Sequence, residues 1–459
     1  MNSIETLLPI GAQWQLELPC YTKGNLDPIL YHCGYCLYEG QSASRMHLIT
    51  DTTASDFSEW CDRVIGMGFE KIYTNAIDDN LYAGFRSNNG KRYYAYYRSK
   101  LGSGVGEVRV ILESADSAPL EAFGYTLSGS DDTAFYLFNL NSSNEDTYLI
   151  RTADRHWILI DGGVSMYSDL VDPDGLFGDA IYEFIRDHGV GEGEKPVISC
   201  WYLTHAHRDH FLGFQALLSR RADDIVLERV IANLPDAQSV THNSNMADFR
   251  KFVSILQEKF PNVPYLKAHE GMKIPLADVT ITVLGTQENL LPFWVSNRDA
   301  YYNFWRHYRT VGADHPNYGE YRTSCKLYDI NNSSIVSMID VNGMTVLETG
   351  DLYRNEWLFP YFKEETLVSD VLKTAHHFIN VELALDYCKL CRNRRIKYVL
   401  ANCRTFMNSS NETSLKEVLE SDQHLIQANS TTIYAFQRQA CGVKMHTIPA
   451  TYSWFQHLK

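Results

Sequence analysis

The N-terminal part of the chain alternates hydrophobic and polar residues with a period of two, which is the pattern of β-strands. A helical pattern over Ser55–Met67 precedes these runs, and Asn89-Gly90 supplies a hairpin turn between the first two of them. We therefore expect a small α+β accessory domain over residues 1–127, followed by a polar linker at Ser128–Thr133. The predicted strands are Leu81–Arg86, Arg92–Arg98 and Glu107–Leu112.

From residue 134 onward, strand and helix patterns follow one another more closely. The segment Asp179–His188 has a helical pattern, Pro196–Leu203 is an almost continuous apolar run typical of a strand buried on both faces, and Phe211–Arg221 is helix-like again. This order of elements predicts an α/β domain over residues 134–459. Earlier strands of this domain are expected at Ala134–Leu140, Thr147–Arg151 and Trp157–Ile160.

The composition is that of a folded globular protein, since 45% of the 459 residues are hydrophobic and 21% are charged. The net charge of −15 disfavours nucleic acid as a partner, although a local basic groove stays open as an alternative. No apolar run is long enough for a membrane span, and the first residues lack the pattern of a signal peptide. Ten cysteines are too few for a disulfide scaffold. We expect a cytoplasmic protein that does not enter a membrane.

The stretch Thr204–His210 places three imidazoles and one carboxylate directly after the continuous apolar run. Imidazole nitrogens and carboxylate oxygens are ligands that zinc prefers, and a loop at a strand end can turn alternate side chains toward one point. His205 and His207 are spaced to share one ion. Asp209 and His210 suit a second ion, as in hydrolases whose two metals lie roughly 3.5–4 Å apart. A histidine-rich surface loop without metal is the alternative.

This His-x-His-x-Asp-His loop resembles the signature of the metallo-β-lactamase superfamily, and the similarity covers roughly residues 134–435. Trp157–Gly163 is similar to the strand and Asp-Gly element that precede the metal loop in that family. Val346–Asp351 resembles the strand that ends in the metal-bridging aspartate. The resemblance implies an α+β sandwich with the four-layer αββα fold, and it implies that Asp351 holds both ions with one carboxylate.

A second part of the resemblance lies in Asp370–His377. It is similar to the strand and double-histidine element of one branch, which includes the hydrolase domain of competence DNA-uptake proteins and the bacterial phosphorylcholine esterases. The run Asn331–Val336 fits the same branch. Many other members carry a further histidine in a Pro-Gly-His turn, where this chain has Gly285–Gln287, but the double-histidine branch lacks it too. The resemblance implies that His376 and His377 complete the metal site.

Four further histidines and two Cys-x-x-Cys pairs lie outside these motifs. Such histidines are more often packed or surface residues, so an extra ligand or a proton shuttle among them is the less favoured alternative. Each cysteine pair has the spacing of a zinc knuckle, but residues three apart on a helix can also share one packed face. A structural zinc is again the less favoured interpretation. These residues are His242, His269, His307 and His315, Cys33 with Cys36, and Cys388 with Cys391.

Metals held by histidine and aspartate lower the pKa of bound water toward neutrality, which predicts a hydrolase with hydroxide as its nucleophile. We expect two zinc ions per chain, with manganese or iron as alternatives. Asp209 and His377 are the expected catalytic residues, and Asp209 can also accept the proton of the attacking water. Asp161 is expected to orient a ligand histidine through its other ring nitrogen. The predicted metal ligands are His205, His207, Asp209, His210, Asp351, His376 and His377.

The stretch 291–327 is unusually rich in aromatic and basic residues and is an insertion in the resemblance. Aromatic faces and guanidinium groups can stack on a substrate and neutralise a phosphate, so we expect a phosphodiester or a related phosphate ester in a small or short substrate. Packing of these aromatics into a second small core is an equal alternative. The residues are Phe293, Trp294, Tyr301, Tyr302, Phe304, Trp305, Arg306, Tyr308, Arg309, Tyr318, Tyr321 and Arg322.

Other functions stay open at this stage. The same metal pair serves hydrolysis of a carboxylic ester, thioester or lactone, and a metal-containing sensor without turnover is a further alternative. The predicted strand Arg92–Arg98 carries tyrosines on both faces. We expect one face to pack on the second domain, while the other meets solvent or a second copy of the chain in a homodimer.

Overall fold

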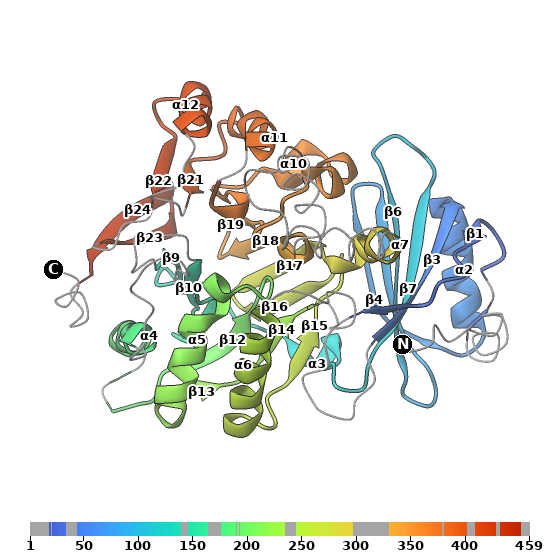
Figure 1. Cartoon of the computed structure of the whole chain (residues 1–459), viewed down its shortest axis with the longest axis horizontal. Helices are drawn as coiled ribbons and strands as arrows, with labels where there is room; N and C mark the ends of the chain where they lie inside the picture. Colours follow the sequence, from blue (N-terminus) through green and yellow to red (C-terminus); the bar gives the residue numbers. More distant parts are fainter. Residues whose placement is uncertain are drawn as a thin grey trace, which may run out of the picture.

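The computed structural model describes most of the chain, and its strands form three β-sheets with helices at their sides (Figure 1). Within this described part, no helix is both long and apolar enough to cross a membrane. The described residues are 18–19, 21–33, 44–138, 146–163, 176–189, 191, 193–234, 245–296, 330–378, 381–401, 409–427 and 432–450.

The first sheet is antiparallel and is built by the N-terminal residues, in the order β1-β3-β7-β6-β5-β4 with β2 paired to β3. The predicted hairpin around Asn89-Gly90 joins β5 and β6. The predicted helix is α2 (Ala54–Gly66), which begins with a capping box at Thr53 and buries Trp60 against the sheet. The strands are β1 (Asn25–Leu26), β2 (Tyr31–Cys33), β3 (Ser44–Thr52), β4 (Glu70–Ile77), β5 (Asn80–Arg86), β6 (Arg92–Ser99) and β7 (Gly106–Leu112).

The second sheet is mixed, in the order β15-β14-β12-β11-β10-β9-β23-β24, with β13 paired to β12. Its centre is parallel, because β11, β12, β14 and β15 run in one direction. The strands predicted around the metal loop are all present. The strands are β9 (Ala134–Leu137), β10 (Thr147–Arg151), β11 (Trp157–Asp161), β12 (Val197–Tyr202), β13 (Val226–Leu227), β14 (Val230–Ala232), β15 (Tyr265–Lys267), β23 (Thr432–Gln439) and β24 (Gly442–Pro449).

The third sheet is also mixed, in the order β22-β21-β20-β19-β18-β17-β16-β8. Its parallel part, β19 to β22, follows an antiparallel meander of β16 to β19. β8 precedes the expected linker at Ser128–Thr133 yet pairs with β16. The strands are β8 (Tyr125–Thr126), β16 (Lys273–Ala277), β17 (Val279–Gly285), β18 (Val336–Val341), β19 (Met344–Glu348), β20 (Val371–Lys373), β21 (Tyr398–Ala401) and β22 (His424–Gln427).

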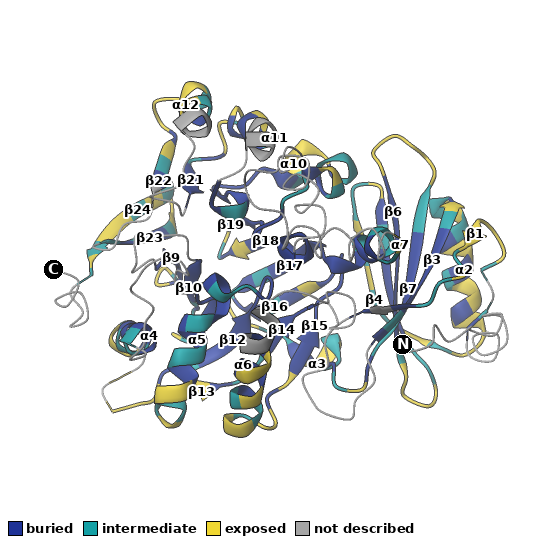
Figure 2. Ribbon diagram, viewed as in Figure 1, coloured by how far each residue is buried: buried dark blue, intermediate teal, exposed yellow. Residues whose placement is uncertain are grey.

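Helices cover one side of each larger sheet, and the other sides of these two sheets share a core. Phe184, Phe214 and Phe252 of α4, α5 and α6 pack on the second sheet, while Leu390 and Leu415 of α11 and α12 pack on the third. Figure 2 shows central strands such as β12, β14 and β17 as largely buried, whereas β24 at the edge and parts of α6 and α12 are exposed. The helices are α3 (Leu120–Phe123), α4 (Leu176–His188), α5 (Arg208–Arg221), α6 (Asn245–Lys259), α7 (Leu291–Ser296), α10 (Glu364–Leu367), α11 (Val381–Cys391) and α12 (Ser409–Val418).

The tyrosine-rich strand β6 corrects one expectation. Tyr94 and Tyr96 belong to the core shared with the two larger sheets, as predicted for one face of the strand. Tyr93 and Tyr97 on the other face are also buried, because they pack with Trp60 of α2. The expectation that this second face meets solvent or another copy of the chain is therefore wrong, since a helix of the same unit covers it.

Candidate metal centre

The predicted metal residues lie at the carboxyl ends of parallel strands. β11 and β12 are parallel neighbours in the second sheet, and β19 and β20 are parallel neighbours in the third. The loop Thr204–His207 follows β12 and leads into α5, Asp351 follows β19, and His376-His377 follow β20. The two sheets meet here, because the backbone N–H of Ile335 donates to the carbonyl of Thr204 over 3.0 Å. The fold thus gathers segments that are far apart in the sequence.

The carboxylate of Asp351 lies at the centre of these side chains. Its Oδ2 atom is 3.2 Å from Nε2 of His210 and 3.3 Å from Nε2 of His377. Nε2 of His205 is 4.0 Å from the same oxygen, and all four side chains are buried. The hydroxyl of Ser334 accepts a hydrogen bond from the backbone N–H of Asp351 over 3.0 Å, which holds the carboxylate in place. Three imidazoles therefore converge on one carboxylate oxygen.

His207 and Asp209 extend this group at two points. Nδ1 of His207 is 3.2 Å from Nε2 of His205, and Oδ2 of Asp209 is 3.5 Å from Nε2 of His377. The arrangement therefore offers two sets of ligand atoms, one with His205 and His207 and one with Asp209 and His377. Both sets adjoin the carboxylate of Asp351.

Asp146 is a further member of the group, which the sequence analysis missed. Asp146, His210, Asp351 and His377 each offer a ligand atom within 4.8 Å of the others. No metal motif surrounds Asp146, but the hairpin of β10 and β11 pairs Thr147 with Asp161. That register puts Asp146 beside the Asp-Gly turn, where its carbonyl accepts from the N–H of Gly162. Asp146 could have been predicted by pairing these two strands in the sequence, because Asp146 precedes the residue that pairs with Asp161.

Lys373 places a buried ammonium group beside these carboxylates. Its Nζ atom is 2.6 Å from Oδ2 of Asp146 and 3.3 Å from Oδ1 of Asp351, and it donates to the carbonyl of Gly350. Although burial opposes the change, Asp146 and Asp351 raise the pKa of Lys373 well above its usual value. Burial raises the pKa of the nearby Glu348 to about 8. The lysine is therefore charged and offsets part of the negative charge of the centre.

Burial and neighbouring charges divide the histidines into two kinds. Burial lowers the pKa of His205 well below its usual value, so its ring is neutral. Burial acts in the same direction on His210 and His377, but the surrounding carboxylates together outweigh it, Asp351 with Asp161 at His210 and Asp351 with Asp146 at His377. The pKa of His210 is well above its usual value, and that of His377 is raised to about 10. A metal ion beside Asp351 would take the place of these protons, since ligand histidines bind in their neutral form.

Asp161 makes the contact expected of it. Its Oδ2 atom is 2.6 Å from Nδ1 of His210 and accepts a hydrogen bond from the hydroxyl of Thr204 over 2.8 Å. Its Oδ1 atom accepts from the backbone N–H of Thr204, also over 2.8 Å. Because Nδ1 of His210 is engaged in this way, Nε2 is the nitrogen that faces Asp351. Histidine ligands of metals are commonly oriented by such a carboxylate.

His376 and His377 point to different partners. His376, His377 and Phe378 have φ angles of 47°, 51° and 61°, a left-handed conformation that residues other than glycine rarely adopt. This turn directs His377 to Asp351, whereas Nε2 of His376 lies 3.1 Å from the hydroxyl of Tyr353. Burial lowers the pKa of His376 to about 3. The double-histidine pair therefore contributes one member, His377, to the four-residue group around Asp351.

Several residues singled out in the sequence lie elsewhere. Nε2 of His269 is 3.0 Å from Glu113 and its Nδ1 is 2.7 Å from Glu288, so its ring nitrogens are engaged by carboxylates. Cys388 and Cys391 are buried free cysteines of α11, which agrees with a packed helix face. Outside the described residues lie His242, His307, His315, Cys36 and residues 297–329 of the aromatic-rich stretch.

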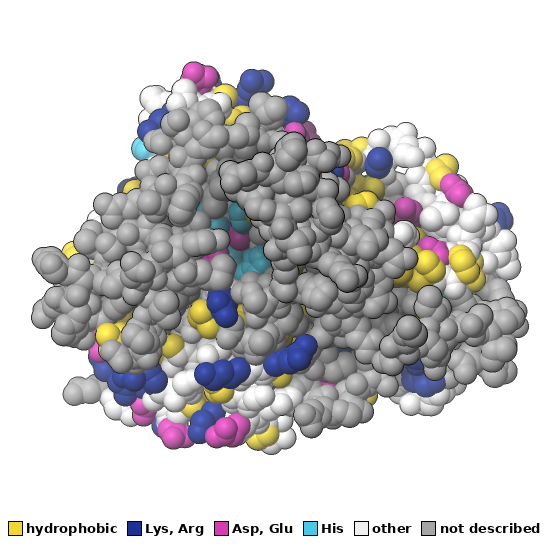
Figure 3. All heavy atoms as spheres, viewed as in Figure 1, with side chains coloured by type: hydrophobic (Ala, Val, Ile, Leu, Met, Phe, Trp, Pro, Cys, Tyr) yellow, Lys and Arg dark blue, Asp and Glu magenta, His cyan; other side chains and the backbone are white. Residues whose placement is uncertain are grey.

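The polar atoms of this group fit a metal ion. Within the described part of the chain, Oδ1 of Asp209 makes no hydrogen bond although it is buried, and Nε2 of His210 and Nε2 of His377 face only carboxylate oxygens. Buried polar atoms are normally satisfied, and imidazole nitrogens with carboxylate oxygens are a zinc-type ligand set. Figure 3 shows histidine and acidic side chains together near the centre of one face of the molecule.

The fold and the site together define an α/β protein that gathers a buried group of aspartates and histidines at the ends of its strands. No known protein family matches the chain, and no curated protein matches it either. Its function must therefore be argued from the chemistry of the site itself.

Proposed function

We propose that this protein is a hydrolase that uses two divalent metal ions, zinc by its ligand chemistry, to cleave a phosphodiester or a related phosphate ester. The observation that carries the proposal is the convergence of three imidazole Nε2 atoms on Oδ2 of Asp351 in a buried site. Bound divalent ions supply a hydroxide nucleophile at neutral pH and stabilise negative charge on phosphoryl oxygens.

Membership in the metallo-β-lactamase superfamily is part of the proposal. Two sheets that share a core, each covered by helices on its other side, support it. The position of the metal residues after β12, β19 and β20 supports it as well, because the resemblance implies ligands in these three segments. The chain departs from the resemblance at His376, whose Nε2 faces Tyr353.

Each residue of the centre has a role in this proposal. His205 and His207 would hold one ion, Asp209, His210 and His377 would hold the other, and Asp351 lies where it could serve both. Asp161 orients His210 through Nδ1, and Lys373 orients Asp351 through Oδ1. Asp209 accepts the proton of the attacking water at Oδ1, the carboxylate oxygen that makes no hydrogen bond to described residues. Asp146 keeps the ammonium group of Lys373 in position.

Metal content and turnover test this proposal together. We expect about two ions per chain by plasma mass spectrometry of protein purified without chelator, and turnover of bis(p-nitrophenyl) phosphate. Asp351→Asn removes the central carboxylate and His210→Ala removes one imidazole, so both variants should lose metal. Turnover should fall by more than about 100-fold, because loss of a residue that only hydrogen-bonds to a metal ligand typically costs about 10–100-fold. Asp340→Asn and His446→Ala are matched controls at exposed positions and should change neither quantity.

Three outcomes would contradict the proposal in different ways. Protein that takes up no metal after incubation with zinc or manganese would remove the enzyme mechanism altogether. Protein that holds two ions and hydrolyses a carboxylic ester, thioester or lactone but no phosphate ester would keep the metal centre and replace the substrate. Retained metal without any turnover would favour a sensor.

A further inference from the structure

We propose that His376 donates a hydrogen bond to a phosphoryl oxygen of the substrate at the accessible side of the metal centre, and that Tyr353 is the residue that positions its ring for this contact. The inference rests on the proposed function, because it assigns both residues to the substrate of the same centre. Tyr353 belongs to no motif of the sequence, and His376 was expected as a metal ligand. The contact needs no change in the charge of either residue.

The histidines of the centre differ in how far solvent reaches them. His205, His210 and His377 are buried. His207 and His376 are half-buried, so they are the members of the group that solvent reaches. Figure 3 shows that histidine and acidic side chains are visible from outside near the centre of one face. A substrate that approaches from solvent therefore meets the half-buried histidines before the buried ones.

The ring of His376 also lies beside the metal residues. Its centre is 5.7 Å from the ring centre of His377, whose Nε2 is 3.3 Å from Oδ2 of Asp351. The backbone N–H of His376 donates over 3.2 Å to the carbonyl of Gly350, the residue before Asp351. Burial dominates the pKa of His376, and the charges of Asp351 and Asp209 also act on it. A phosphate ester held at Asp351 therefore adjoins this ring.

The two ring nitrogens of His376 differ in their partners. Nε2 is 3.1 Å from the hydroxyl of Tyr353, and the centres of the two rings are 4.2 Å apart. Within the described residues, Nδ1 is buried and makes no hydrogen bond. When the hydroxyl donates to Nε2, the proton of the neutral ring lies on Nδ1, which then needs an acceptor. A phosphoryl oxygen of a phosphodiester is such an acceptor.

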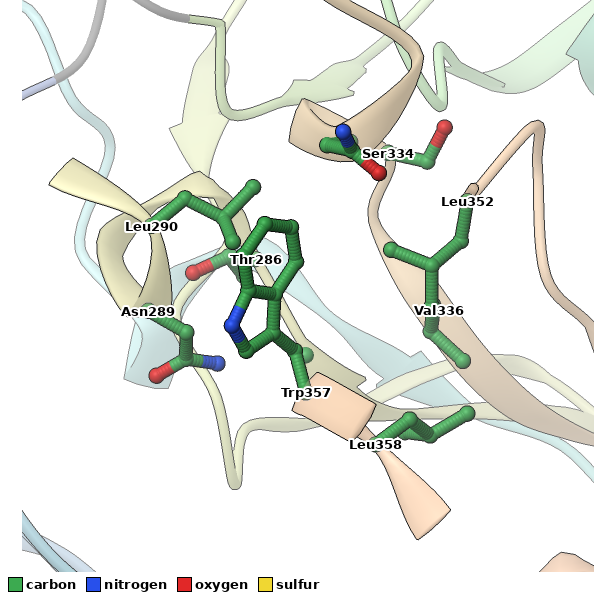
Figure 4. Close-up of a pocket in the computed structure, with 10 residues that line it drawn as sticks. Thr286, Asn289, Leu290, Ser334, Val336, Leu352, Trp357 and Leu358 are labelled. Atoms are coloured by element: carbon green, nitrogen blue, oxygen red, sulfur yellow. The ribbon is translucent and has the colours of Figure 1, made fainter. Parts of the chain in front are cut away.

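The segment that carries Tyr353 is fixed by contacts on both sides. The backbone N–H of Tyr353 donates to Oδ1 of Asn332 over 3.0 Å. Leu352 before it and Leu358 after it pack in one buried cluster with Val336, and Figure 4 shows these three side chains together. The hydroxyl therefore orients the neighbouring imidazole before a substrate binds, which is how partners of site residues support binding.

The two residues can be tested by variants that preserve their surroundings. Tyr353→Phe keeps the aromatic ring and removes only the hydroxyl. His376→Asn suits the φ of 47°, because asparagine tolerates left-handed conformations. Its amide nitrogen can take the place of Nδ1 but cannot reach the place of Nε2, so it keeps a donor and loses the contact with Tyr353. Tyr361→Phe is the control, since it removes a hydroxyl from the same segment at a ring that lies under Arg98.

The first test measures binding apart from catalysis. The probe is dimethyl phosphate, a phosphodiester anion, added to zinc-loaded full-length protein and followed by ligand-observed NMR. Tyr353→Phe should weaken binding by about tenfold, as for loss of a hydrogen bond to a charged group, while His376→Asn should stay within about threefold of the wild type. Adding Tyr353→Phe to His376→Asn should change nothing further, because the hydroxyl acts only through the imidazole. Tyr361→Phe should bind like the wild type.

A spectroscopic measurement completes the test. Long-range proton–nitrogen NMR spectra of the histidine rings should show the proton of His376 on Nδ1 in the wild type, and its partial transfer to Nε2 in Tyr353→Phe. Zinc content should be the same in all variants, because the residues that would hold the ions are untouched.

Four outcomes decide between the possibilities. Loss of zinc in Tyr353→Phe or His376→Asn would make His376 a metal ligand and overturn the inference. Binding of dimethyl phosphate that is equal in wild type and Tyr353→Phe, or a proton on Nε2 in the wild type, would overturn it even if turnover is present. Tyr353-dependent binding in a protein without any turnover would support the pair and contradict the proposed function.

Discussion

Two buried aspartates at strand ends differ in what they face. Asp161 accepts hydrogen bonds from Thr204 and lies against Nδ1 of His210, and its burial raises its pKa. Asp351 faces the Nε2 atoms of several histidines, and His377 with His210 holds its pKa well below the usual value although burial opposes this. The same residue type therefore serves as an orienting group in one place and as the central acceptor in the other.

Asp161→Asn should weaken metal binding by about 10–100-fold while the protein stays folded, because His210 loses its charged partner. The backbone supports this substitution, since Asp161 has a φ of 59° and asparagine tolerates left-handed conformations. Affinity is measured by competition with a metal chelator. Asp51→Asn is the matched control, because Asp51 also has a positive φ of 56° but is exposed. Equal metal affinity of the wild type and Asp161→Asn would show that Asp161 does not support metal binding.

At the scale of elements, Arg98 of strand β6 links the N-terminal sheet to segments that flank strands of the third sheet. Nε of Arg98 is 3.1 Å from Oε2 of Glu270, and both side chains are almost fully buried. Glu270 also accepts the amide of Asn289, and Arg98 donates to the carbonyl of Trp357. The guanidinium carbon of Arg98 lies 3.5 Å from the ring centre of Tyr361. One arginine of the first sheet therefore joins the segment before β16 to the segment after β19.

Arg98→Met should lower the free energy of unfolding by roughly 3–5 kcal/mol, because it leaves the carboxylate of Glu270 buried without its partner. Adding Glu270→Gln should recover part of this loss, since the double variant contains no unpaired buried charge. Chemical denaturation of the metal-free protein measures both. Arg86→Met on β5 breaks the exposed pair with Glu70 and should change stability little. A double variant less stable than Arg98→Met alone would contradict this account.

At the scale of the whole molecule, a second buried ionic group joins the first sheet to the rest of the chain. His269 lies between Glu113 and Glu288, and its ring centre is 5.1 Å from that of Tyr94. The positive charge of Lys267 helps to lower the pKa of Glu113. Burial would lower the pKa of His269, but the two carboxylates raise it to about 10. Burial would raise the pKa of Glu113, but His269 lowers it to about 2.

These shifts predict how stability depends on pH. The raised pKa of His269 increases the free energy of unfolding. This contribution is fully present below pH 6.5 and is lost as the pH rises to about 10. The lowered pKa of Glu113 adds stability that is complete above pH 4.5 and is lost as the pH falls to about 2. With chelator present, the Tm of the wild type should fall between pH 6.5 and 10 more steeply than that of His269→Gln. Parallel curves would show that His269 is not charged, and His446→Gln serves as the exposed control.

Most elements of the fold were predictable because they depend on local pattern. The alternating runs became β5, β6 and β7, and the continuous apolar run became β12 in the parallel centre of the second sheet. The outer face of β6 was mispredicted, since a period of two shows that a strand has two faces but not what covers each of them. The pairing of β8 with β16 was not predicted, because two residues carry too little pattern.

The sequence alone determined which side chains of this protein could bind a metal. The spacing of His205, His207, Asp209 and His210 after a buried strand, and the positions of Asp351 and His377 after two others, are properties of the chain. Only the tertiary structure decided that Asp146 joins this group and that His376 turns to Tyr353. The physical reason is that ligand type is a property of a residue, whereas distance depends on strand register and on left-handed turns that bring remote segments together.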